Sequence, residues 1–120
     1  MFGVEVLYTK RPGDFARWLP RQRRASEIWL VFYKKTSGRQ TVAYKNALQD
    51  ALCYGWIDSR VKSIGPERFT VRFTPRKLGS PWSKRNLALA ETLLQSGRMT
   101  EAGIAVLPPR LRRKASDVSR

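Results

Sequence analysis

The residues of this sequence that are best suited to chemistry are cations, and they gather between Trp56 and Asn86. Guanidinium and ammonium groups bind phosphate oxygens, and hydroxyl and backbone N–H groups can complete such a site. The spacing of these cations places them on a predicted hairpin and on the loop and helix start that follow it. The candidate residues for binding an anion or nucleic acid are Arg60, Lys62, Arg72, Arg76, Lys77, Ser83, Lys84 and Arg85.

The predicted hairpin consists of residues 56–64 and 68–75, joined by a turn at Gly65-Pro66-Glu67. Such a turn fixes which residues of the two arms are opposite one another. The expected pairs are Ile64 with Arg68, Lys62 with Thr70, Val61 with Val71, Arg60 with Arg72, and Asp58 with Thr74.

This register sets Arg60 directly across from Arg72, with Lys62 adjacent. Like charges in that position destabilise a sheet by roughly 0.2–1 kcal/mol. Two explanations remain open for such an arrangement. Either Asp58 neutralises the cluster from a neighbouring position, or the cluster awaits a bound anion.

The second cationic segment is TPRKLGSPWSKRN, residues 74–86. Ser80 is expected to cap a helix whose first turn contains Pro81. A helix start presents free N–H groups and a partial positive charge, which together with the nearby cations favour a phosphate. Trp82 has two interpretations, since it can stack on a base or pack in the core.

The common catalytic arrangements are missing from the sequence. There is no His, so a histidine-ligated metal site and a Ser-His-Asp or Cys-His catalytic set are excluded. Cys53 is a single cysteine, and the nine acidic residues are scattered. The spacing GxxxxGK[ST] of a P-loop is absent. We therefore expect a protein that is not an enzyme and holds no cofactor or metal ion.

The charge of the chain points to an anionic partner. Its 24 Lys and Arg residues against nine acids give a net charge of +15, which attracts polyanions at long range. Nucleic acid is the expected partner, with an acidic protein or an anionic lipid surface as alternatives. No stretch approaches the ~20 apolar residues of a membrane span. The absence of a secretory leader and the unpaired cysteine predict a cytoplasmic location.

The elements that must position these cations indicate an α+β domain with an antiparallel sheet of about four strands and helices packed on it. The expected strands are residues 4–8, 27–35, 56–64 and 68–75, and the expected helices are residues 14–19, 41–54, 81–96 and 100–106. The unbroken apolar run Ile28 to Tyr33 predicts a central strand covered on both faces.

The composition divides the chain into a domain, residues 1–107, and a basic tail, residues 108–120. The tail sequence PPRLRRKASDVSR is rich in Arg and Lys and offers little to bury. We therefore expect it to be disordered.

Four blocks carry a family resemblance: EIWLVFYKK, ALQDALCYGWIDSRVKSI, RFTVRFTPRKLGSPWSKRN and SGRMTEAGIA. In this order they resemble the YdeI/OmpD-associated family, the bacteriocin-protection proteins. The resemblance implies an α+β domain loosely akin to the YjbR/frataxin-like group, corresponding to the N-terminal domain of the family with the C-terminal segment absent. It implies no catalytic residues. It implies a part in envelope-stress or bacteriocin protection.

The sequence thus leaves two hypotheses for function. The first is a non-enzymatic basic domain that binds phosphate-rich partners, nucleic acid above all, largely independently of sequence. The alternative is a YdeI/OmpD-associated protection protein that acts through a protein partner. Salt dependence separates the two, because contacts to phosphates weaken steeply with salt.

Overall fold

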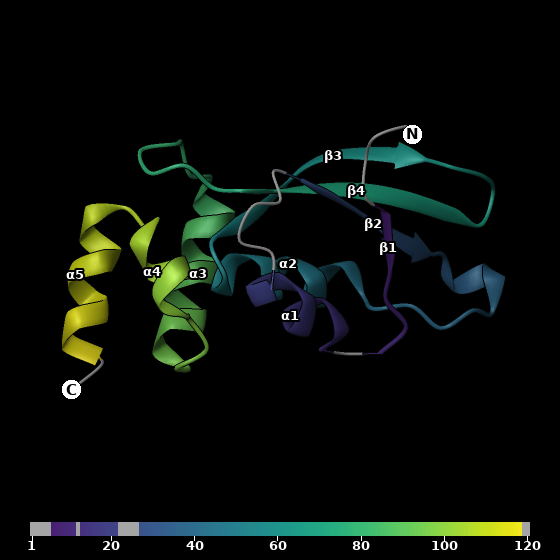
Figure 1. The fold of residues 1–120 in the computed structure, drawn as a ribbon. Coiled ribbons are helices and arrows are strands. Elements are labelled where there is room, and N and C mark those ends of the chain that lie inside the picture. The colour runs from purple at the N-terminus through teal and green to yellow at the C-terminus, as the bar shows by residue number, and fades with distance from the viewer. Residues whose placement is uncertain (1–5, 12, 22–26, 119–120) are drawn as a thin grey trace.

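The computed structural model describes residues 6–11, 13–21 and 27–118 of the 120-residue chain. Within this part the chain forms four strands, five α-helices and two short 3-10 helices (Figure 1). The strands are β1 (Val6–Tyr8), β2 (Ile28–Tyr33), β3 (Trp56–Ser63) and β4 (Arg68–Pro75). The helices are α1 (Asp14–Trp18), α2 (Tyr44–Cys53), α3 (Lys84–Gln95), α4 (Glu101–Ala105) and α5 (Pro109–Val118). The 3-10 helices are η1 (Leu19–Arg21) and η2 (Lys35–Ser37).

The four strands form one sheet in the order β1-β2-β4-β3. Strand β4 is antiparallel to both β2 and β3, whereas β1 is parallel to β2. The predicted α+β class with a largely antiparallel sheet is confirmed, and the parallel edge pair departs from the expectation. The two strands are parallel because helix α1 lies between them in the sequence and carries the chain back to the end of the sheet at which β1 began. Residues 4 and 5 of the expected first strand lie outside the described part.

One face of the sheet, the inner face, packs against helices α1 and α2, which lie below it in Figure 1. Alternate residues of the strands point to this face because the side-chain period of a strand is two. The central side chains are almost completely buried, with Ile28, Leu30, Val71 and Phe73 each at 0% exposure. The cluster also contains Phe32 of β2 and Trp56 of β3, together with five residues from outside the sheet: Phe15, Leu19, Val42, Ala47 and Ala51.

Helices α3, α4 and α5 lie together beyond one end of the sheet, on the left of Figure 1. Residues 109–118, expected to be part of a disordered tail, instead form helix α5. The cause is an apolar pair one helical turn apart, since Leu111 is fully buried and Ala115 is 6% exposed. Lys114 of α5 also forms an ion pair with Glu91 of α3. No helix of the described chain has the length and apolar character needed to span a membrane.

The opposite face of the sheet, the outer face, lies away from all the described helices (Figure 1). Trp29 and Tyr33 of β2 belong to this face and are partly exposed, while Val31 between them is 6% exposed. The prediction that both faces of this strand are covered is therefore wrong at Trp29 and Tyr33, whose outer sides are only partly covered. The run of apolar residues gave no sign of this, because a ring half covered by its neighbours looks the same in sequence as a buried one.

Candidate functional site

The β3–β4 hairpin has the predicted register over most of its length. Arg60 is opposite Arg72, Val61 is opposite Val71 and Lys62 is opposite Thr70, and the N–H of Ile64 donates to the carbonyl of Arg68. Turn chemistry and hydrophobic alternation therefore agree near the turn. The juxtaposition of the two arginines is a real feature of the outer face.

The register changes beyond Arg60, where the ladder contains a bulge between Asp58 and Arg60. Asp58 is opposite Phe73, and the predicted pairing with Thr74 is wrong. In a regular strand, residues two apart share a face. Because Ser59 is an extra residue in β3, Asp58 and Arg60 lie on opposite faces of the sheet instead. Asp58 consequently points to the inner face.

The hydroxyl of Tyr44 donates a hydrogen bond to the Asp58 carboxylate on that inner face. Burial of the phenol, and then this hydrogen bond to a carboxylate, raise the pKa of Tyr44 above its ordinary value. The explanation in which Asp58 neutralises the arginine cluster is therefore wrong, because the carboxylate faces away from it.

Glu27, just before β2, supplies a carboxylate on the outer face. It forms an ion pair with the guanidinium of Arg72, and both side chains are about one-third exposed or less, at 27% and 32%. Arg60 and Lys62 are exposed, and no described carboxylate pairs with either of them. The cluster thus has one neutralised member and two that pair with no carboxylate in the described part of the chain.

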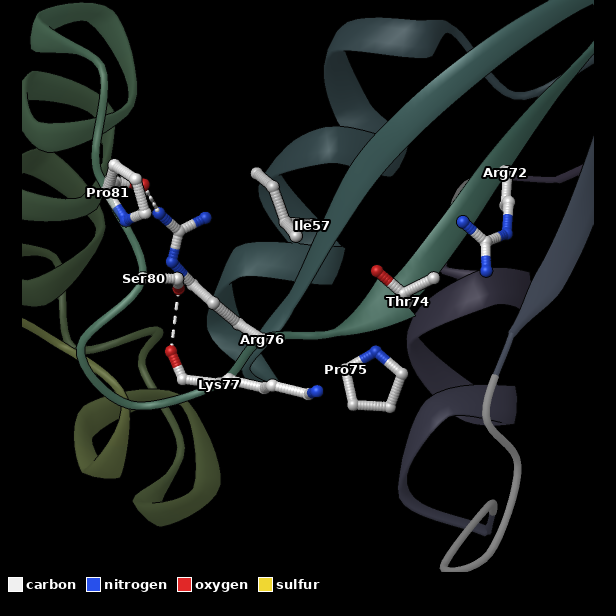
Figure 2. Close-up of a pocket in the computed structure, with 8 residues that line it drawn as sticks. All are labelled: Ile57, Arg72, Thr74, Pro75, Arg76, Lys77, Ser80 and Pro81. Carbon is white, nitrogen blue, oxygen red and sulfur yellow. Dashed lines mark hydrogen bonds between the residues drawn. The ribbon is translucent and has the colours of Figure 1, made fainter.

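A hollow of about 480 Å³ continues from Arg72 to the loop after β4 (Figure 2). Figure 2 shows Arg72 at one end and Arg76 with Lys77 at the other. Its lining residues are Ile57, Arg72, Thr74, Pro75, Arg76, Lys77, Ser80 and Pro81. Three cations and two hydroxyl groups therefore line one shallow depression, and no carboxylate of the described residues does. This is a suitable composition for an anion.

Arg76 holds a fixed position at one wall of this hollow. Its guanidinium lies 3.7 Å from the centre of the Trp82 ring and donates to the carbonyl of Pro81. Burial lowers the pKa of Arg76, and its Nε has no hydrogen-bond partner among the described residues. Stacking on an aromatic ring fixes the plane of an arginine, so that less freedom is lost when an anion binds.

Trp82 is partly buried and contacts two apolar clusters next to the sheet, one around Leu93 and one around Leu107. Since Arg76 also stacks on this ring, the interpretation of Trp82 as a packed core residue accounts for the structure. A base would have to compete with Arg76 for it.

The predicted helix start is displaced by one short turn. Helix α3 begins at Lys84, and the hydroxyl of Ser83, not that of Ser80, accepts from the N–H of Asn86 at 3.1 Å. Ser80 donates to the carbonyl of Lys77 instead. Both serines have the spacing of a cap, and the sequence alone does not choose between them.

Ser83, Lys84 and Arg85 do not line the hollow. Ser83 is occupied as the cap of α3, and Lys84 and Arg85 are exposed on its first turn. The charge of Arg85 acts on the phenol of Tyr44, which belongs to the inner side of the sheet. Of the eight predicted residues, the structure therefore gathers Arg72, Arg76 and Lys77 around the hollow and sets Arg60 and Lys62 beside them on the hairpin.

Cys53, at the end of α2, is the remaining candidate for covalent chemistry. It is buried, and burial raises the pKa of its thiol to about 11. A thiol of that pKa stays protonated near neutrality and is a poor nucleophile. Among the described residues, no three side chains of Cys, Asp or Glu lie together in a way that could hold a metal ion.

Fold and site together define a small α+β domain whose sheet is covered by helices on one face and carries cations on the other. The chain belongs to a family described as a domain of unknown function (DUF8412), whose model matches residues 7–106. This range includes every residue of the hollow and ends before α5. No curated protein and no solved structure matches the chain. The resemblance to the YdeI/OmpD-associated family stays a prediction.

Proposed function

We propose that the protein is a non-enzymatic binding domain for phosphate-rich polymers, with nucleic acid as the partner. The observation that carries this proposal is the continuity of its cations. Arg60, Lys62 and Arg72 on the outer face of the hairpin lead directly into the hollow that contains Arg76 and Lys77. A polymer with regularly spaced phosphates can contact such a row at several points.

The balance of charge along this row supports the proposal. Among the described residues, Glu27 is the carboxylate that forms an ion pair with a member of this row, and its partner is Arg72. Arg60, Lys62 and Lys77 are exposed, so their charges are available to a ligand. Since the contacts would be to backbone phosphates and not to base edges, we expect binding to be largely independent of sequence.

The lack of catalytic groups fits a binding role. The chain has no His, and the thiol of Cys53 has a raised pKa. A neutral buried thiol also suits the reducing cytoplasm, where we propose that the protein acts.

The test is the binding of a fluorescent oligonucleotide at several salt concentrations, measured by fluorescence anisotropy. The variant is the double substitution Arg60→Gln and Lys62→Gln, because neither residue pairs with a described carboxylate. We expect it to lower affinity about tenfold at low salt and to reduce the slope of log affinity against log salt by about one for each lost phosphate contact. The fold should be unchanged, since both side chains are exposed.

A matched control removes the same charge elsewhere. Lys45 on α2 and Arg113 on α5 are exposed and lie away from the outer face, so Lys45→Gln with Arg113→Gln changes the net charge equally. If this control weakens binding as much as the hairpin variant does, binding follows overall charge and the proposed surface is wrong. If the wild type binds no nucleic acid, or binds it without salt dependence, the proposed function is wrong and a protein partner becomes the better hypothesis.

A further inference from the structure

The outer face of the sheet is divided into an aromatic half and a basic half. Strand pairing sets Trp29 beside Arg72, Val31 beside Thr70, and Tyr33 beside Arg68. The next strands extend these rows outward, with Tyr8 beside Val31 on one edge and with Arg60 and Lys62 on the other. Strands β1 and β2 thus present Tyr8, Trp29 and Tyr33, and strands β4 and β3 present Arg68, Arg72, Arg60 and Lys62.

The aromatic half is accessible and is itself accompanied by cations. Tyr8 and Tyr33 meet edge to face with ring centres 5.1 Å apart, and Tyr8 is 36% exposed. The ammonium of Lys10 lies 6.0 Å from the Tyr8 ring centre, and the guanidinium of Arg39 lies 5.3 Å from that of Tyr33. Both cations are exposed and lie farther from their rings than Arg76 lies from Trp82, so a base can displace them and stack on the same π surface.

A second hollow, of about 350 Å³, opens beside Tyr33. It is lined by Tyr33, Arg39, Ile64, Gly65, Pro66, Glu67 and Arg68. This hollow is separate from the one around Arg76 and lies at the other end of the hairpin, next to its turn. Its combination of a ring, two guanidinium groups and one carboxylate differs from a simple phosphate site.

We propose that the outer face binds single-stranded nucleic acid, with the phosphates on the basic half and unstacked bases on the aromatic half. The inference rests on the proposed function and names the class of nucleic acid. Neighbouring strands are roughly 5 Å apart, so a base on β2 and the phosphate of the same nucleotide on β4 are within reach of one another. The hollow beside Tyr33 receives a base, since the carboxylate of Glu67 disfavours a phosphate there and can accept the N–H groups of a base edge.

A duplex would use only part of this surface. Its bases are stacked on one another and paired, so the rings of Tyr8, Trp29 and Tyr33 would find only sugars and phosphates. A single strand can turn its bases outward onto aromatic side chains while its phosphates follow a cationic groove. The aromatic half therefore predicts a preference for single strands, although a duplex has the higher charge density.

The test compares a short fluorescent oligothymidylate with the duplex formed by adding its complementary oligoadenylate, at equal salt. The variants are Tyr33→Leu, which removes the ring, and Tyr33→Phe, which keeps it. We expect Tyr33→Leu to weaken binding of the single strand about five- to 150-fold, the range for loss of one stacked base. Binding of the duplex should change little, and Tyr33→Phe should bind like the wild type. Thermal unfolding of both variants verifies that each is folded.

The outcomes separate this inference from the proposed function. If Tyr33→Leu is folded and binds the single strand like the wild type, or if the wild type prefers the duplex, the single-strand inference is overturned. The proposed function still stands in that case, provided that Arg60→Gln with Lys62→Gln weakens binding. If neither oligonucleotide binds the wild type, both proposals fail together.

Discussion

The two faces of the sheet are built from the same strands and yet differ in almost every property. On the inner face, Leu30 and Phe73 are fully buried in one apolar cluster. On the outer face, Trp29 and Arg72 occupy the neighbouring positions of the same two strands and are partly exposed. Alternation along a strand therefore separates residues that hold the fold from residues that are free to contact a partner.

This difference has a practical consequence for mutagenesis. Substitutions on the inner face should change the free energy of unfolding and leave the intrinsic affinity of the folded protein for its ligand unaltered. Substitutions of the exposed residues on the outer face should do the reverse, whereas Val31 and Thr70 in the middle of that face are buried and should also contribute to stability. The following predictions test that division, beginning with the largest expected effect.

The largest effect is expected for Phe73→Ala on the inner face. Phe73 is 0% exposed and packs against Phe15 with ring centres 5.1 Å apart. Its truncation should lower the free energy of unfolding by about 3–5 kcal/mol, measured by denaturant titration. The outer-face variant Tyr33→Leu is the control and should lose much less. Equal losses in the two variants would mean that the outer face is also structural.

Tyr44→Phe comes next, because it removes the hydrogen bond to Asp58 at the edge of the inner face. Loss of a bond to a charged group should cost about 1–3 kcal/mol and leave oligonucleotide binding unchanged. A weaker affinity in the folded variant would show that Asp58 does influence the outer face.

The raised pKa of Tyr44 also predicts a pH dependence. Since the folded pKa exceeds that of an unfolded tyrosine, about 10, the neutral phenol stabilises the protein fully below that pH. The contribution is lost as the pH rises through the folded pKa. In a spectrophotometric titration a component should ionise above the ordinary range of a tyrosine, and Tyr44→Phe should remove this late component. Its persistence in the variant would contradict the assignment.

Glu27→Gln should have a smaller effect. We expect it to lower the stability of the fold and to raise the affinity for an oligonucleotide. The pair with Arg72 is partly exposed, so its loss should lower the free energy of unfolding by less than about 1 kcal/mol. Affinity for an oligonucleotide should rise, about two- to tenfold at low salt, because the variant removes a negative charge from the outer face. Weaker binding would mean that the ion pair is needed to hold Arg72 in place.

The smallest effect is expected for Val61→Ala, which tests where the inner face ends. Val61 is opposite Val71 but is 68% exposed, whereas Val71 is fully buried. We expect a change within about 0.5 kcal/mol for Val61→Ala. The matched variant Val71→Ala should cost about 2 kcal/mol by the same denaturant titration. Similar costs at the two positions would show that some other part of the chain covers Val61.

The parts of the fold that follow from local rules could be predicted from the sequence. The turn at Gly65-Pro66-Glu67 and the alternation of Phe69, Val71 and Phe73 were sufficient to set the hairpin register near the turn, and with it the pair Arg60–Arg72. Helix α2 also follows from the spacing of its apolar residues, although it begins at Tyr44 and not at residue 41.

The parts that depend on distant contacts could not be predicted. The bulge at Ser59 brings Asp58 to the hydroxyl of Tyr44, which lies on another element and far from it in the sequence. The sequence of helix α5 does place Leu111 and Ala115 on one face, but so few apolar residues among many cations form a stable helix only where α3 and α4 pack against it. Glu27 and Arg72 are brought together only by the pairing of β2 with β4.

The sequence predicted the cations of the candidate site but not its aromatic residues. Arg60, Lys62, Arg72, Arg76 and Lys77 were named because their charge is visible in sequence. Trp29 and Tyr33 were assigned to a covered strand, since exposure of a ring depends on what packs over it. The spacing of Trp29, Val31 and Tyr33 places them on one face of β2, but all six residues of the strand are apolar, so the sequence does not show which face the helices cover.

The bulge at Ser59 has a consequence for the evolution and design of this surface. In a regular strand Asp58 and Arg60 would share a face, and each would cancel part of the other's electric field. The single inserted residue sends the acid to one side and the base to the other without altering either of them. Homologous sequences with the spacing Asp-x-Arg in this strand but no bulge should therefore have a weaker positive potential over the hairpin, even at the same net charge.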